Sequence, residues 1–337
     1  MFRIKFTHTY QHIISIENLL LAWGEFKRGK KSRKDVQWFE RDLMQNIILL
    51  HDDLVNKTYT HSKYEAFTIS DPKLRNIHKT SVRDRLLHRA LYRQLYPFFD
   101  KTFISDSFSC RVNKGTHKAL RRFRVFSNKV SKNNTKTVWV LKCDIRKFFA
   151  SIDQLVLIEI IKKYIYDQDI VSLISRIIGS FSSTRKGVGL PLGNLTSQLL
   201  VNIYMNEFDQ FVKHTLKAKY YIRYADDFVF LSDDKKWLES TLSQITTFLE
   251  ERLHFSLHPN KTFIQTLASG VDFLGWVHFV DHHVIRTVTK RRMISVIEEK
   301  QGKEDVVQSY LGLLSHGNAY RLREKIKEMK KENKQIK

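Results

Sequence analysis

The chain has 337 residues, enough for one large core or two to three subdomains, and its 42% of hydrophobic residues exclude global disorder. Its 58 lysines and arginines exceed its 35 aspartates and glutamates by 23, so nucleic acid is the expected partner and an anionic membrane surface the alternative. No apolar stretch is long enough for a membrane span, no signal-peptide pattern follows Met1, and two cysteines make no disulfide framework, so we expect a cytoplasmic protein with no membrane partner.

The first part of the chain is predicted to be mostly helical. Apolar residues recur at helical spacing in two stretches of residues 8–57, and a basic run over 27–34 separates them. A solvated loop and a phosphate contact are equally good interpretations of that run. Short strands and turns are expected over 64–77, and a helix over 81–99.

The second part alternates strands and helices. A buried strand is expected over 138–144, ending on an acid. Further along, we expect helices over 153–180, 197–217 and 235–253, hairpins over 220–231 and 271–280, and a basic helical tail from Arg286 onward. Because this order has no regular βαβ rhythm, it predicts an α+β fold in which helices back an antiparallel sheet.

Two adjacent acids, Asp226 and Asp227, lie at the tip of the first predicted hairpin. Adjacent carboxylates raise each other's pKa unless a cation offsets them, and a pair of divalent metals is a natural remedy. Taken alone, the pair is better explained as an ordinary β-turn. Asp144 changes this balance, because it ends a strand expected beside the hairpin and its side chain would reach the same ions. An N-cap at a strand–helix turn is the alternative for Asp144, and the neighbouring hairpin favours the metal-ligand interpretation.

Three segments resemble, in order and approximate spacing, motifs A, B and C of reverse transcriptases: residues 141–149, 189–198 and 224–227. Flanking segments resemble the two fingers motifs, motif D and the primer-grip hairpin of that family: 73–85, 107–117, 258–262 and 271–276. The resemblance covers roughly residues 60–280. It implies an RNA-directed DNA polymerase with a right-hand fold, in which fingers and a short helical thumb flank an antiparallel palm sheet.

The same resemblance implies four parts. These are an N-terminal helical extension over 1–60, fingers over 61–139, a palm over 140–284 with fingers helices at about 153–188, and a helical thumb over 285–337.

Individual roles also follow from the resemblance. Metal binding falls to Asp144, Ile145, Asp226 and Asp227, which would hold two Mg²⁺ ions, with Mn²⁺ as the alternative. Lys261 would protonate the leaving pyrophosphate as a general acid, and a solvated turn lysine is an equal alternative. The remaining assignments are Lys73, Arg75, Phe149, Leu192, Gly193 and Gln198 for the incoming dNTP, and Arg83, Arg111, Tyr224, Leu274 and Gly275 for nucleic acid.

Some of these roles have structural alternatives. Phe149 would clash with a 2′-hydroxyl, but ordinary core packing is the other interpretation, and Phe148 can fill that core position instead. Arg83 is equally expected to pair with Asp84 or another acid. Arg111 is expected to brace the fingers or touch the template rather than take part in chemistry.

Motif B departs from the usual family pattern at two positions. Leu192 stands where most members have glutamine, and Gln198 stands where they have proline. This variant resembles the enzymes of diversity-generating retroelements, whose copying is error-prone opposite adenine. Leucine cannot hydrogen-bond the incoming nucleotide, so discrimination would fall. The resemblance implies a structured noncoding template RNA, a nascent cDNA and a small accessory protein as partners.

Three other functions remain open. A reverse transcriptase of an antiphage defence system would use the same core to copy a dedicated noncoding RNA. A non-catalytic RNA-binding protein on a polymerase scaffold would keep the basic charge but need not keep the three acids. A two-metal nuclease would cut template without dNTPs, and the matches at Phe149 and motif D weigh against it.

Overall fold

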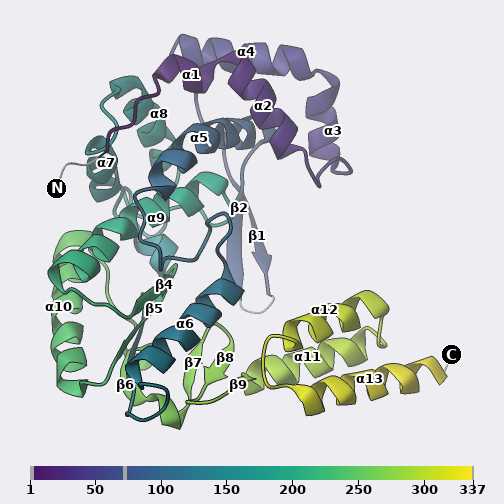
Figure 1. Cartoon of the computed structure of the whole chain (residues 1–337). Coiled ribbons are helices and arrows are strands. Elements are labelled where there is room, and N and C mark those ends of the chain that lie inside the picture. The colour runs from purple at the N-terminus through teal and green to yellow at the C-terminus, as the bar shows by residue number, and fades with distance from the viewer. Residues whose placement is uncertain (1–3, 71–73, 336–337) are drawn as a thin grey trace. The chain divides into compact units, whose positions relative to one another are not determined.

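The computed structural model describes residues 4–70 and 74–335, and it divides into two compact units (Figure 1). Unit 1 comprises residues 1–105, 145–217 and 245–257, and unit 2 comprises residues 106–144, 218–244 and 258–337. These bounds differ from the four ranges expected from the sequence, because 106–139 groups with the palm strands and 145–217 does not. The division into extension, fingers, palm and thumb therefore stays a prediction. Within the described ranges, no helix combines the length and apolarity that a membrane span requires.

Unit 1 is mainly helical. Its elements are α1 (Tyr10–Ile14), α2 (Ile16–Phe26), α3 (Lys34–Arg41), α4 (Leu43–Val55), β1 (Glu65–Ile69), β2 (Arg75–Lys79), α5 (Val82–Asp100), α7 (Gln154–Lys162), α8 (Gln168–Gly179), α9 (Leu195–Gln210) and the end of α10 (Lys235–Leu253). The helix α5 packs against α2 and α9. Its apolar face is buried as the sequence predicted, with Leu86, Leu87 and Leu91 essentially inaccessible.

The helical stretch expected over 153–180 is interrupted. Asp153 caps α7 by accepting hydrogen bonds from the backbone N–H groups of Leu155 and Val156. Asp167 caps α8 in the same way. A second capping aspartate inside the stretch satisfies the free N–H groups of a new helix start, so the chain begins a second helix there.

Unit 2 holds the sheets. Its elements are α6 (Thr116–Val130), β3 (Trp139–Asp144), β4 (Tyr221–Tyr224), β5 (Asp227–Ser232), β6 (Phe263–Thr266), β7 (Val271–Phe273), β8 (Trp276–His278), β9 (His283–Ile285), α11 (Thr287–Glu299), α12 (Glu304–Leu314), α13 (Tyr320–Gln335) and the start of α10. One antiparallel sheet has the order β4-β5-β3-β6, and a second has the order β7-β8-β9. The predicted strand at 138–144 and both predicted hairpins are confirmed.

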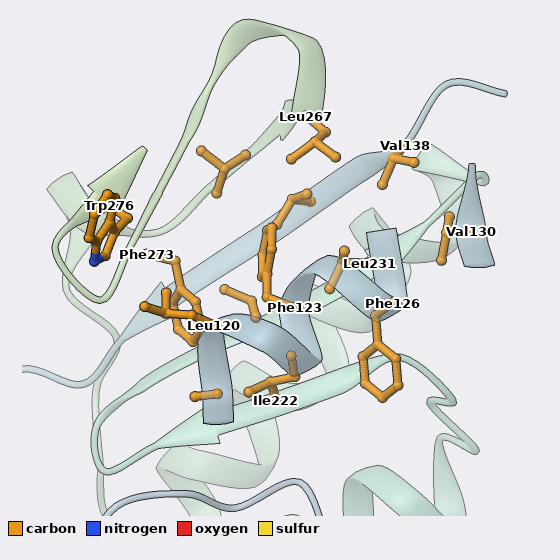
Figure 2. Close-up of a cluster of buried hydrophobic side chains, with 14 of the residues drawn as sticks. Leu120, Phe123, Phe126, Val130, Val138, Ile222, Leu231, Leu267, Phe273 and Trp276 are labelled. Carbon is orange, nitrogen blue, oxygen red and sulfur yellow. The ribbon is translucent and has the colours of Figure 1, made fainter. Parts of the chain in front are cut away.

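The core of unit 2 lies where α6 covers the first sheet. Figure 2 shows Leu120, Phe123 and Phe126 of α6 in one buried cluster with Ile222 and Leu231 of the strands. No helix or strand was expected over residues 116–130. The apolar positions of α6 recur every three to four residues and the basic residues lie on the other face, so the helix is amphipathic and its signal was present in the sequence. Burial against the sheet makes this helix a structural element.

The C-terminal helices α11, α12 and α13, the last two drawn in yellow in Figure 1, pack on one another. Met293, Ile297, Val307, Leu314 and Ile326 form a small core between them. The helical tail expected from Arg286 onward is confirmed.

Candidate active site

The pairing of β3 with β5 brings two predicted metal ligands together. The strands are antiparallel, in a register that sets Asp144 directly opposite Asp227. The sequence predicted that the strand ending at Asp144 would lie beside the hairpin, and this pairing confirms it. Opposed residues in such a ladder have Cβ atoms about 4.5–5.5 Å apart, close enough for their side chains to interact.

A two-residue turn carries the third acid. β4 and β5 pair up to Tyr224 and Asp227, which leaves Ala225 and Asp226 as the turn. Ala225 has a φ of +56°, the left-handed region that favours glycine and costs another residue about 1–2 kcal/mol. The buried flanking strands maintain this conformation, and Asp226 stays at the tip next to Asp227.

The alternation of side chains along each strand determines which residues share a face at this end of the sheet. On β5, Asp227 shares a face with Val229 and Leu231, both part of the core under α6. On β3, Asp144 shares that face with Val140 and Lys142. The sheet face is therefore apolar along most of its length and acidic at its end.

Asp227 has an unusual electrostatic setting. Burial raises its pKa to about 7; Lys142 opposes this rise, and Asp226, Asp144 and Asp272 add to it. The Lys142 Nζ lies 3.7 Å from Asp227 Oδ2. The other oxygen, Oδ1, is buried and has no hydrogen-bond partner. A buried, unpartnered carboxylate oxygen is costly, so this position gains from a bound cation.

Lys261 lies beside Asp144. It is in a short 3₁₀ turn, Pro259–Lys261, and its Nζ donates to Asp144 Oδ1 over 2.9 Å. The backbone also joins the two segments, because His258 N–H donates to the Asp144 carbonyl over 2.8 Å. The predicted general acid is thus held against a predicted metal ligand. Asp144 ends a strand and caps no helix.

The donor set matches a hard divalent ion in its chemistry. Carboxylate oxygens are the ligands that Mg²⁺ prefers, and Asp227 Oδ1 is an oxygen without a partner. Between residues 4 and 335, apart from 71–73, no three His, Cys, Asp or Glu side chains are arranged so that they could hold an ion. Lys142 and Lys261 supply the positive charge beside the acids in this arrangement.

The segment after Asp144 belongs to unit 1. Ile145 is buried and pairs with Leu257 in an isolated antiparallel bridge. Phe148 is buried against the ring of Phe255, with ring centroids 5.5 Å apart, while Phe149 stays partly exposed. Phe148 therefore takes the core position, and the partly exposed Phe149 ring packs edge-on against it, with ring centroids 5.5 Å apart.

The motif B turn is tied to β2 within unit 1. His78 N–H donates to the Leu192 carbonyl over 2.9 Å, and Asn194 Nδ2 donates to the His78 carbonyl over 3.1 Å. Gly193 has a φ of +106°, and a Cβ there would lie 2.7 Å from the Ile77 side chain, so glycine is needed on both counts.

For the other residues predicted to bind the dNTP, the structure gives their position and exposure. Arg75 is the exposed first residue of β2. Gln198 is partly buried in the first turn of α9. Lys73 lies outside the described residues.

Arg83 is engaged within unit 1. Its guanidinium pairs with Asp53, lies 3.9 Å from Asp84, donates to the Thr60 carbonyl over 3.3 Å and stacks over the Tyr59 ring. This arrangement favours the structural ion pair over the nucleic-acid contact.

In unit 2, the residues predicted to bind nucleic acid lie on two hairpins and a loop. Arg111 donates to the Ser107 carbonyl over 3.0 Å, which fits its predicted bracing role. The Tyr224 hydroxyl accepts a hydrogen bond from Thr116 over 3.2 Å. Leu274 and Gly275, with φ of +53° and +87°, form the tight turn between β7 and β8.

Two charged residues at this site were missed by the sequence analysis. Arg223 is fully buried on β4, where it donates to Ser107 Oγ over 3.1 Å and to the Ala225 carbonyl over 3.3 Å, so it holds the turn that carries Asp226. Lys142 is only 8% exposed on β3. The available signal was a single cation within an otherwise apolar strand, because such a charge is retained only where it has partners.

Opposed aspartates at the end of an antiparallel strand pair, helices behind the sheet and a following helical bundle define the palm of a right-hand nucleic-acid polymerase. A family model described as reverse transcriptase (RNA-dependent DNA polymerase) matches residues 68–278. The chain belongs to the reverse transcriptase family, and its class is that of RNA-directed DNA polymerases, which are nucleotidyltransferases.

The chain is similar to a bacterial protein, to a group II intron-encoded protein and, in fold, to a telomerase. Protein YkfC of Escherichia coli (strain K12) is 25% identical over 299 residues, which cover 76% of each chain. The group II intron-encoded protein LtrA of Lactococcus lactis subsp. cremoris is 22% identical over an alignment covering 85% of this chain and 58% of LtrA. A structure of apo telomerase from Candida tropicalis, truncated from its C-terminal domain, matches with a TM-score of 0.50 and 14% identity over 68% of this chain and 55% of the telomerase. That likeness shows the fold.

Proposed function

We propose that this protein synthesises cDNA from dNTPs on an RNA template by two-metal nucleotidyl transfer. The observation that carries the proposal is the register of β3 and β5, which opposes Asp144 and Asp227 and leaves Asp227 Oδ1 buried without a partner. Membership of the reverse transcriptase family supports the same activity. The expected partners are a primed RNA, its growing cDNA and dNTPs.

In this mechanism Asp144, Asp226 and Asp227, together with Ile145, would hold the metal pair. Two bound divalent ions would activate the primer 3′-hydroxyl and neutralise charge on the triphosphate. Lys261, held by Asp144, gives the proton at its Nζ to the leaving pyrophosphate.

The remaining predicted residues bind and orient. Phe149 is partly exposed and selects against a 2′-hydroxyl by a steric clash. Arg75 and Lys73 attract the triphosphate by charge. Template and primer contacts are assigned to Arg111, Tyr224, Leu274 and Gly275.

Primer extension on an RNA template tests this activity. Asp227→Asn removes the charge but keeps the shape, so extension with Mg²⁺ and dNTPs should fall by about a hundredfold or more. Asp233→Asn is the matched control, because Asp233 follows the same strand but pairs with Lys136 away from the other acids, and it should extend like the parent. Full activity in Asp227→Asn would discard the site.

We also propose that copying is error-prone opposite template adenine, as in a diversity-generating retroelement. Leu192 supports this, since its side chain offers no hydrogen bond while its carbonyl is occupied by His78. Leu192→Gln should lower misincorporation at adenine by about tenfold, the scale of one recovered polar contact. Leu155→Gln, at a 73% exposed leucine of α7, serves as control. Sequencing cDNA made from a mixed-base template measures both, and an adenine error rate equal to that at other bases contradicts the proposal.

A structured noncoding RNA and a small accessory protein are the proposed partners of this activity. The formal charge of +23 supports an extended RNA contact. Sequencing the RNA that co-purifies with the protein tests the first partner. A random sample of cellular RNA would contradict a dedicated template, whereas one repeated noncoding species would support it.

A further inference from the structure

Lys142 occupies a position where a lysine is costly. It is the fourth residue of β3, two before Asp144, and it is 8% exposed on a sheet face between apolar core residues and the acids at its end. A buried ammonium group persists in such a place only when its donors are satisfied. Its partners therefore indicate why it is there.

Those partners join two different parts of unit 2. The shorter contact runs from Lys142 Nζ to the main-chain carbonyl of Asp272 on β7, over 2.5 Å. The longer one, 3.7 Å, reaches Asp227 Oδ2. Lys261, by comparison, makes its contact of 2.9 Å directly with an acid, Asp144. A lysine that only neutralised Asp227 would not direct its closest contact to a hairpin backbone.

The connection continues beyond the hairpin. The Asp272 carboxylate pairs with the guanidinium of Arg286, the residue that precedes α11. The backbone N–H of Arg286 donates to the carbonyl of Gly275, in the β7–β8 turn, over 3.1 Å. Asp227, Lys142, Asp272 and Arg286 thus form an unbroken series of polar contacts from the acid cluster to the first C-terminal helix.

We propose that Lys142 is a positioning residue that fixes the β7–β8 hairpin, and through Arg286 the start of α11, at a set distance from Asp227. The inference rests on the proposed function, in which the hairpin supports the primer end and Asp227 serves the reaction at that end. A hairpin that contacts the primer terminus positions the 3′-hydroxyl for reaction only if the hairpin itself stays in place relative to the acids. Misplacing the reacting groups by about 1 Å can lower the rate by about a hundredfold.

Hydrogen exchange of the full-length protein without nucleic acid tests the connection directly. In Lys142→Met, amides of Val271–Phe273 and Trp276–His278 should exchange about tenfold faster, while amides of β4 and β5 keep their protection. Lys142→Arg, which keeps the donors, should restore most of the protection. Primer extension in Lys142→Met should lose kcat with little change in KM for dNTP.

Two further variants separate this role from alternatives. Lys261→Met removes the other cation beside the acids and touches no hairpin, so it should slow extension but leave exchange of β7 and β8 as in the parent. Arg286→Gln removes the ion pair with Asp272 at a partly exposed residue outside the core, and it should speed exchange in the hairpin and in the first turn of α11. Because this variant does not alter the core, it tests the proposal even if Lys142→Met does not fold. Unchanged hairpin exchange in both Lys142→Met and Arg286→Gln overturns the proposal. A parent protein that extends no primer refutes the polymerase assignment alone, since the exchange result stands without it.

Discussion

Asp84 shows how much one buried side chain can organise. It is fully buried at the start of α5 and accepts hydrogen bonds from the Tyr59 hydroxyl, Thr80 Oγ1 and Ser81 Oγ, at 2.7–2.8 Å. Burial alone would raise its pKa, but the hydrogen bond from Thr80, the nearby His61 and the bonds from Tyr59 and Ser81 lower the pKa to about 2. The neighbouring Arg83 guanidinium, 3.9 Å away, thus faces a carboxylate that stays ionised.

The Asp84 carboxylate should stabilise the protein in acid. Because its pKa is lowered from 3.8 to about 2, its contribution is complete above pH 4 and is lost as the pH falls towards 2. Asp84→Asn should therefore cost about 2 kcal/mol or more at pH 7, and the difference from the parent should narrow below pH 4. Urea unfolding at several pH values measures it. A constant difference at every pH would contradict the ionised network.

Asp227 should show the opposite dependence in the metal-free protein. Its pKa is raised from 3.8 to about 7, so the group costs nothing below pH 4, and stability is lost as the pH rises from about 4 to about 7. Asp227→Asn should stabilise the metal-free protein at pH 8 by on the order of 2 kcal/mol and have little effect at pH 4. Thermal unfolding in the presence of a chelator measures this. A destabilised Asp227→Asn at pH 8 would show that the carboxylate is satisfied without a cation.

At the scale of the elements, β8 and the loop after α12 are in close van der Waals contact. A Cβ at Gly317 would lie 2.1 Å from a ring carbon of Trp276, whereas a Cβ at Gly312 would meet nothing within 4 Å. The loop also bonds to β9 through Asn318 N–H and the His283 carbonyl, over 3.0 Å. The C-terminal helices are therefore anchored to the second sheet by close contact at one glycine.

Gly317→Ala should loosen this anchor. The overpacking should cost about 1–3 kcal/mol, and proteolysis should become faster at the 315–319 loop. Gly312→Ala, inside α12, is the matched control and should be neutral or stabilising by about 0.5–1 kcal/mol. Equal stability of the two variants would mean that the loop adapts freely to the indole ring.

Most strands and helices could be predicted from local patterns, and the short strands that were not expected have tertiary causes. The buried strand to Asp144 and the hairpin at Asp226 are confirmed because apolar runs and turn residues specify them locally. The short strands β6 and β9 were not expected, since their few residues become strands only by pairing with β3 and β8.

The candidate site divides in the same way. Its three acids could be found from the sequence, because each ends a predicted strand or occupies a predicted turn. Lys142 and Arg223 could not, since their meaning depends on Asp272 and on Ser107, more than a hundred positions away along the chain. The parts of a site that are set by long-range partners are invisible in a single sequence.

The whole molecule carries a formal charge of +23, which predicts a strongly salt-dependent affinity for RNA. The logarithm of the binding constant should fall linearly with the logarithm of salt, with a slope of about −0.7 for each phosphate contacted on a single strand. If the basic loop 27–34 contacts phosphate, replacing its exposed Arg28 and Lys31 by glutamine should reduce that slope by about 1 to 1.5.

The control replaces Lys162 and Lys235, which pair with glutamates on their own helices, by glutamine. Their loss changes the net charge equally but should leave the slope close to that of the parent. Fluorescence anisotropy over a salt series distinguishes the two. Identical slopes for both double variants would mean that the loop lies in solvent and contacts no phosphate.

The register that opposes Asp144 and Asp227 also limits which changes in length β3 can accept. Deleting one residue between Trp139 and Cys143 would put the two parts of the strand out of phase, so that either the residues before the deletion or the acid after it would turn to the opposite side of the sheet. A substitution in β3 changes one side chain at a time. A deletion instead turns every side chain before it to the other face of the sheet, or it moves the acid out of register with Asp227. The length of this strand should therefore be more strictly constrained than most of its side chains, and a library of single-residue deletions should be inactive throughout it.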